Sequence, residues 1–173
     1  MDPFSITVGV LTLADVTQRI VSFLKQIKSA STKIQDEIDT LTNEIEALTI
    51  ANDSVQGMWN IKCEATGLYI SDETTSMVDS LWSNMGLILQ QTKNTIVKLE
   101  GLLKEVLGKK GALTLNRLES FMALIRKEDR YNEYTQVRQR LTNYQAGIQM
   151  LLLALNTCVE LICLRTKTTA DFV

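Results

Sequence analysis

The chain of 173 residues contains no histidine, a single proline, and three cysteines that form no Cys-x-x-Cys pair. Histidine is the usual base beside a serine or cysteine nucleophile, and zinc sites draw on histidine and on paired cysteines. The nucleophile elbow Gly-x-Ser-x-Gly is also missing. We therefore expect no enzyme activity, no catalytic residue, no metal ion and no cofactor.

Charge gives no sign of a nucleic-acid partner either. The formal net charge is −2, divided into +2 over residues 1–35, −9 over 36–80 and +5 over 81–173. Solvated helix faces commonly carry such mixed signs. The stretch Gly-Lys-Lys-Gly at 108–111 lacks the glycine that a phosphate-binding loop needs five residues earlier, because Leu103 stands there.

The cysteines and the first residues indicate a cytoplasmic protein. Cys158 and Cys163 lie in an apolar stretch, where cysteine usually acts as a small buried apolar residue. A secretion signal requires a positive segment ahead of its apolar stretch, whereas Asp2 precedes this one. We expect one domain over residues 1–173 in a reducing compartment.

Helix-breaking residues are scarce, and no stretch alternates with the period of a strand, so the sequence predicts an all-α fold. The expected helices cover residues 3–28, 32–55, 74–107, 115–127 and 129–165, which makes a bundle of four long helices and one short helix. In the expected helix at 32–55, apolar residues at three- and four-residue steps form the side that would pack in a bundle, here called the seam, and Asn52 occupies one place in it. The last is apolar on most sides from Met150 onward, with Glu160 its only charge before Arg165, which predicts a central, enclosed position.

The first helix has the most unusual composition. From Pro3 to Ala14 it has no charge and carries six large apolar side chains, Phe4, Ile6, Val8, Val10, Leu11 and Leu13. That stretch spans about 18 Å, short of a hydrocarbon core of about 30 Å, but a helix extended to Leu24 spans about 33 Å. The segment suits the core of a bundle, insertion into a membrane, or each of these in a different state.

A narrow polar stripe runs along the same helix. Thr12, Asp15, Arg19, Ser22 and Gln26 recur at three- and four-residue steps, and Asp15 and Arg19 have the spacing of an intrahelical ion pair. A single copy would cross a bilayer poorly, since each central charge costs several kcal/mol. Several copies could turn their stripes toward a shared aqueous lumen, which is the arrangement of a pore-lining helix.

The opening Met-Asp-Pro-Phe-Ser-Ile, the amphipathic helix that continues it and the acidic seam Ile-Gln-Asp-Glu-Ile-Asp-Thr-Leu-Thr-Asn-Glu-Ile-Glu-Ala-Leu together resemble a known family. They are similar to the N-terminal domains of fungal STAND (NLR-like) proteins, the HeLo-like domains of programmed cell death and heterokaryon incompatibility. The resemblance implies a helical bundle similar to the four-helix domain of mixed-lineage kinase domain-like proteins.

For function, the resemblance implies a membrane-targeting, pore-forming or membrane-disrupting effector of innate immunity. On regulated oligomerisation such a domain moves from the cytoplasm to the plasma membrane and releases its N-terminal helix, here residues 1–28. The six apolar side chains would engage the anionic lipid of the plasma membrane, and an NLR-type regulatory protein or domain would control the step. The alternative is an adaptor of the same fold that oligomerises or docks partners without lysing membranes.

Overall fold

Four α-helices make up the part of the chain that the computed structural model describes, residues 3–30, 35–64, 72–107 and 128–170. They are α1 (Pro3–Ala30), α2 (Gln35–Glu64), α3 (Asp72–Leu107) and α5 (Glu128–Ala170). Side chains are described for residues 6–28, 35–61, 75–104 and 131–161. No strand occurs within these ranges, which confirms the all-α prediction. The short helix expected over 115–127 lies outside the described residues.

Residues at the helix ends explain most of the boundaries. Proline at the first position of α1 loses no intrahelical hydrogen bond, because that N–H would have no partner. Asp36 and Glu37 lie in the first turn of α2, and Lys28 lies in the last turn of α1, each with the sign that the helix dipole favours. The helices at 3–28 and 74–107 were predicted to within two residues. The expected end of the second helix at 55 is wrong, because α2 continues to Glu64, and α5 continues beyond the expected end at 165.

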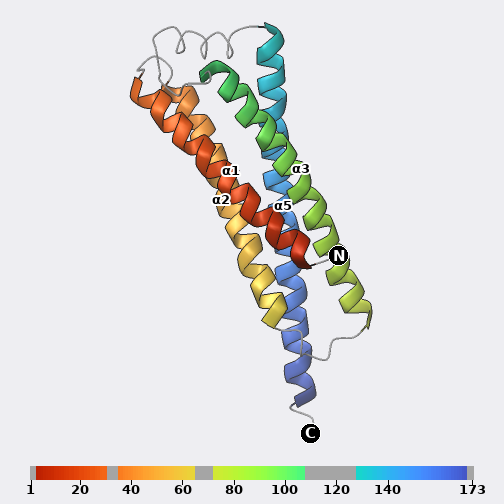
Figure 1. The fold of residues 1–173 in the computed structure, drawn as a ribbon. Coiled ribbons are helices and arrows are strands. Elements are labelled where there is room, and N and C mark those ends of the chain that lie inside the picture. The colour runs from red at the N-terminus through yellow and green to blue at the C-terminus, as the bar shows by residue number, and fades with distance from the viewer. Residues whose placement is uncertain (1–2, 31–34, 65–71, 108–127, 171–173) are drawn as a thin grey trace.

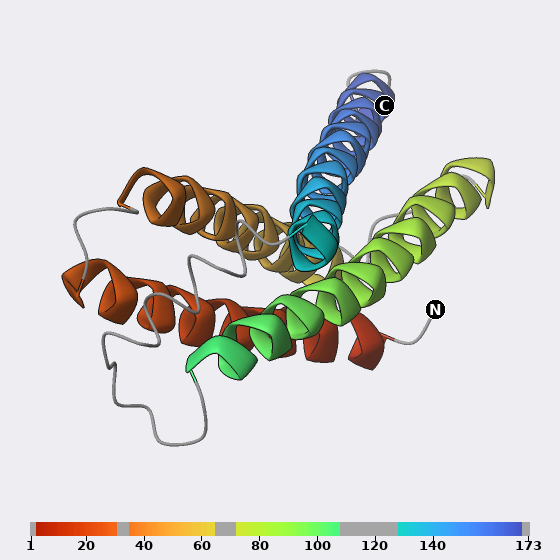
Figure 2. The same cartoon turned by 90° about the horizontal axis from the view of Figure 1, so that it is seen from above.

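The helices form a ring in which α1 and α5 occupy opposite corners. α1 packs against α2 and α3, and α5 packs against the same two helices (Figures 1 and 2). α1 and α2 run antiparallel, since Val10 meets Asn52 and Lys28 meets Asp39. α3 runs parallel to α1 and antiparallel to α5 (Figure 1). The sequence alone did not predict which helices would be neighbours.

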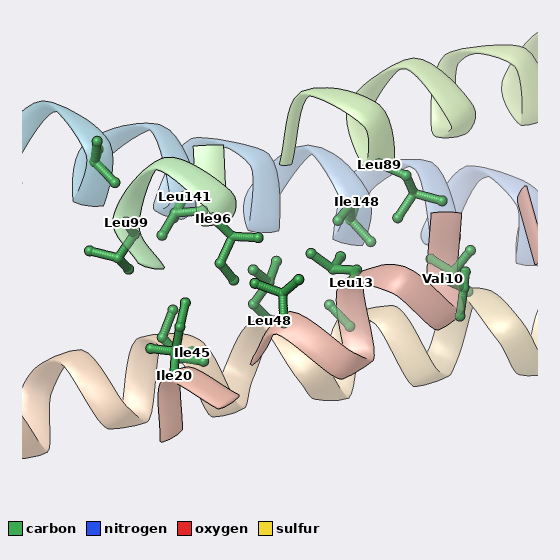
Figure 3. Close-up of a cluster of buried hydrophobic side chains, with 14 of the residues drawn as sticks. Val10, Leu13, Ile20, Ile45, Leu48, Leu89, Ile96, Leu99, Leu141 and Ile148 are labelled. Carbon is green, nitrogen blue, oxygen red and sulfur yellow. The ribbon is translucent and has the colours of Figure 1, made fainter. Parts of the chain in front are cut away.

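The core is a continuous column of aliphatic side chains along the centre of the ring. Figure 3 shows part of it, with α1 contributing Val10, Leu13 and Ile20, α2 contributing Ile45 and Leu48, and the rest coming from α3 and α5. The predicted seam of α2 is buried along its described length, and Asn52 is buried within it. Cys158 is also buried, as predicted.

Two tryptophans lie across the diagonal of the ring. Trp59 of α2 and Trp82 of α3 are buried, and their ring centroids are 4.8 Å apart at an interplanar angle of 76°. Edge-to-face pairs of this kind add about 0.5–1.5 kcal/mol to the energy of burial. They are the only tryptophans of the chain, so their fluorescence reports on this region.

The prediction that the end of the last helix would be enclosed is wrong. Met150 and Leu153 of α5 are 73% and 70% exposed, and Leu161 is exposed as well. A helix at a corner of a four-membered ring turns only one side toward the core, so apolar residues around its whole circumference leave the outer side uncovered. Ile148 and Leu155 occupy the inner side and are buried.

Candidate functional site

The apolar residues at the start of α1 divide between two opposite sides of the helix. Ile6, Val10 and Leu13 are buried in the core. Val8 and Leu11 point outward, and Leu11 is 62% exposed. The side chain of Phe4 lies outside the described residues. The buried residues recur at three- and four-residue steps, as packing against a core requires. Core packing does not require an apolar residue at position 11.

α1 is long enough and apolar enough to cross a membrane. Within the described part of the chain, residues Ile6–Lys28 are the one segment that meets this criterion of length and composition, and core helices of soluble bundles also meet it. Its 23 residues span about 35 Å, against about 30 Å for a hydrocarbon core. Lys25 and Lys28 lie near the end of the segment, where long basic side chains can reach the headgroups.

Several polar side chains of α1 find partners within α1 itself. The hydroxyl of Thr12 donates to the carbonyl of Val8 at 2.6 Å, and the hydroxyl of Thr17 donates to the carbonyl of Ala14 at 2.8 Å. Asp15 and Arg19 form the predicted intrahelical ion pair. Groups that are already hydrogen-bonded cost less to transfer into lipid than unpaired groups do.

Other polar contacts join α1 to its neighbours, and the sequence did not predict them. The side-chain amide of Asn52 donates to the carbonyl of Val10 at 3.0 Å, while its own oxygen is buried without a partner. Lys28 pairs with Asp39 on α2. The sequence marks Asn52 only as a polar residue in an apolar seam, and that irregularity is the available signal for an interhelical contact.

A polar link between α1 and α3 is centred on Glu100. Its carboxylate is almost fully buried and accepts from Arg19 Nε at 2.9 Å and from Lys104 Nζ at 2.7 Å. Burial alone would raise the pKa of Glu100, but the hydrogen bonds and positive charges of Lys104 and Arg19 outweigh burial and lower that pKa below its ordinary value. Arg19 therefore connects the polar stripe of α1 to the interior of α3.

This link makes the stability of the bundle depend on pH. A carboxylate with a lowered pKa in the folded state stabilises the protein above its unfolded-state pKa of about 4.3, and this contribution is lost as the pH falls below that value. We expect the Glu100→Gln variant to unfold more easily than the unsubstituted protein at pH 7. The difference should shrink as the pH falls below about 4.3 and vanish once the pH is below the lowered folded-state pKa of Glu100. Urea unfolding followed by circular dichroism at pH 7 and at a series of acidic pH values measures it, and a difference that stays constant as the pH falls contradicts the assignment.

A shallow groove of about 840 Å³ runs between the outer sides of α1 and α2. Ser22 and Gln26 of the polar stripe line it, together with Gln18, Val21, Lys25, Glu46, Thr49 and Ile50. The groove is open to solvent and has both charged and apolar walls. Ser22 thus lies on the α2 side of the helix, while Arg19 reaches the α3 side.

Comparison with known proteins gave no relative. No family model, no curated protein and no solved structure matches the chain. Within the described ranges, no group of three acidic, cysteine or histidine side chains is placed to hold a metal ion. What the described structure does offer is a helical bundle whose N-terminal helix is apolar, long, and joined to its neighbours by a few polar contacts.

Proposed function

We propose that this bundle is a membrane-disrupting effector domain that releases α1 into a lipid bilayer. The observation that carries the proposal is the first half of α1, which has no charge from Pro3 to Ala14 and is apolar on its outer side as well as its inner side. A helix that served only as core would need apolar residues on the inner side alone. The resemblance of the opening residues to fungal cell-death domains supports the same function.

The energy of the resting state sets the conditions for release. α1 buries seven large apolar side chains, Ile6, Val10, Leu13, Val16, Ile20, Leu24 and Ile27. At about 1.5–3 kcal/mol each, their burial contributes roughly 10–20 kcal/mol, which is comparable to the net stability of a whole domain. Release into water is therefore rare. A bilayer or neighbouring copies must receive the helix.

Regulated oligomerisation is the proposed trigger. When a regulatory NLR-type protein or domain holds several copies together, their effective concentration rises without any new contact. Released helices could then turn Thr12, Asp15, Arg19 and Ser22 toward one another and the opposite side, with Leu13 and Ile20, toward lipid. Val8 and Leu11 lie on the same side of the helix as the stripe, in its uncharged first half. Lys25 and Lys28 would meet anionic headgroups at the plasma membrane. The resting protein would be cytoplasmic.

The Leu11→Glu variant tests this proposal. Leu11 already faces solvent, so we expect the free energy of unfolding to change by no more than about 0.5 kcal/mol. A carboxylate in the hydrocarbon of a bilayer costs up to about 2.5–3.5 kcal/mol, the value at the bilayer centre, which is up to roughly a hundredfold in an equilibrium constant. The measurement is dye release from phospholipid vesicles on which the protein is concentrated through a histidine tag and a chelating lipid.

The matched control is Val97→Glu, which makes the same change at an exposed apolar residue of α3. We expect Val97→Glu to release dye as the unsubstituted protein does and Leu11→Glu to release almost none. Equal release by both folded variants contradicts the proposal. A protein that self-associates but releases no dye under any condition would instead be the adaptor considered above.

A further inference from the structure

The two halves of α1 are held in the bundle by different interactions. In the second half, Arg19 pairs with Glu100 of α3, and Lys28 pairs with Asp39 of α2. The first half, residues 3–14, has no charged residue and therefore forms no side-chain ion pair. Apolar packing and uncharged hydrogen bonds hold the first half in place.

The hydrogen bond that Asn52 makes with the first half leaves a buried oxygen unpaired. Asn52 is fully buried on α2, and its side-chain nitrogen donates to the backbone carbonyl of Val10 at 3.0 Å. Because a carbonyl can only accept, this bond fixes which end of the amide faces α1. The other end, Oδ1, is buried and has no hydrogen-bond partner in the described part of the chain. Such an acceptor has lost its hydration without gaining a bond, which weakens the contact between α1 and α2.

A second oxygen of the same kind lies one helical turn further along α2. Gln56 follows Asn52 by four residues, so the two share one side of the helix. Its nitrogen donates to Asn60 Oδ1 at 2.9 Å, while its own oxygen is buried without a partner. Among the described side chains, Asn52 and Gln56 carry the buried oxygens that lack a hydrogen bond, and both lie on the side of α2 that meets the first half of α1.

Polar groups buried along the second half of α1 do have partners. The hydroxyl of Thr17 donates to the carbonyl of Ala14 at 2.8 Å. The carboxylate of Glu100 accepts from Arg19 at 2.9 Å and from Lys104 at 2.7 Å. Moving Arg19 away would leave Glu100, which is almost fully buried, with one cation fewer. The second half is therefore the more firmly held part of the helix.

Opening of the first half relieves the unpaired group on α2. In an α-helix the carbonyl of Val10 also accepts from the amide four residues further on, so it keeps a hydrogen bond when it leaves Asn52. Asn52 then gains water at both of its polar atoms. We infer that Asn52 keeps the first half of α1 loosely docked, so that α1 opens from its N-terminal end while Arg19 and Lys28 still hold the second half. The opening needs no membrane, and only its use in lipid rests on the proposed function.

Amide hydrogen exchange in water, without vesicles, tests this inference. We expect the amides of residues 6–13 to exchange at least ten times faster than those of residues 20–27. Asn52→Leu keeps the branched shape of the side chain and removes both polar atoms, so exchange of residues 6–13 should slow at least tenfold. The matched control is Thr92→Val on α3. It removes a buried hydroxyl that has a partner, the carbonyl of Ile88 at 2.7 Å, and should change exchange of residues 6–13 less than threefold.

Arg19→Gln distinguishes opening of one half from release of the whole helix. This variant removes the ion pair with Glu100, which stays intact when only the first half opens. Exchange of residues 20–27 should therefore become at least fivefold faster, whereas exchange of residues 6–13 should change less than twofold. Circular dichroism verifies that each variant is folded.

Equal exchange rates in the two halves of the unsubstituted protein overturn the inference. It is also overturned if Asn52→Leu exchanges residues 6–13 as fast as the unsubstituted protein does, or if Arg19→Gln accelerates both halves equally. For release into lipid, Asn52→Leu should slow dye release at least tenfold. Slower exchange with an unchanged rate of dye release leaves the inference intact and counts against the proposed function.

Discussion

Oxidation of a Gly9→Cys, Leu89→Cys variant is expected to abolish vesicle leakage, and reduction is expected to restore it. A Cβ built on Gly9 of α1 lies 3.8 Å from the Cβ of Leu89 on α3, which is about the mean separation across a disulfide. The bond would fix the first half of α1 to α3 without adding bulk at the outer side. Because the proposed mechanism requires α1 to leave α3, dye release should fall to background in the oxidised form.

The controls lie within the same molecule. The reduced form of the double variant has the same sequence as the oxidised form, and the single variant Leu89→Cys carries the same loss of core volume under oxidising conditions. Cys63, Cys158 and Cys163 are replaced by alanine to leave one possible pair. Undiminished leakage by fully oxidised protein would refute release of α1.

The second large effect, faster dye release, is expected when a side chain of α3 that packs against α1 is shortened and α1 itself is unchanged. Leu89 is buried beside Gly9, and Leu89→Ala should reduce the free energy of unfolding by about 2–5 kcal/mol. Part of that loss is free energy that holds α1 against α3. Each 1.4 kcal/mol changes the equilibrium between docked and released α1 by a factor of ten. We therefore expect dye release to become at least tenfold faster, the opposite of the Leu11→Glu result.

Leu141→Ala is the comparison that separates release of α1 from general instability. Leu141 is buried on α5, which packs against α2 and α3 at the corner opposite α1. We expect urea denaturation to show a similar loss in the free energy of unfolding. The leakage rate should nevertheless stay within threefold of that of the unsubstituted protein. If both variants accelerate leakage equally, the step that limits leakage is unfolding of the whole bundle.

Local chemistry made much of the fold predictable. The apolar period of each helix, together with Pro3 and the charged end residues, was enough to place α1 and α3 to within two residues. The ion pair between Asp15 and Arg19 was predicted for the same reason, since residues four apart share one side of any helix. The buried place of Asn52 followed from its position in the seam of α2.

Contacts between distant residues were not predictable in this way. Arg19 and Glu100 are 81 residues apart, and nothing in either local stretch indicates the other. The order of helices around the ring depends on how four apolar sides fit together, which one sequence does not specify. The same limit explains the error on α5. Apolar residues on all sides predict enclosure only if other helices surround the helix, and here its outer side has no covering helix within the described residues.

The start of α1 contains both a feature that the sequence predicts and one that it does not. The sequence identified α1 as the unusual segment but could not divide its apolar residues into those that hold the core and those that face outward. Position 13 is fully buried and position 11 is exposed, although both are leucine. That division makes the functional tests specific, because Leu11 can be altered without disturbing the packing around Leu13.

The distance between α1 and α2 in the presence of vesicles tests the central claim most directly. Spin labels at Leu11→Cys and Asp53→Cys, in the background without native cysteines, occupy exposed positions near the contact of Val10 with Asn52. Double electron–electron resonance should give one short distance in solution and a second, longer distance whose population grows with dye release. A single unchanged distance in vesicles that have leaked would show that α1 never left the bundle.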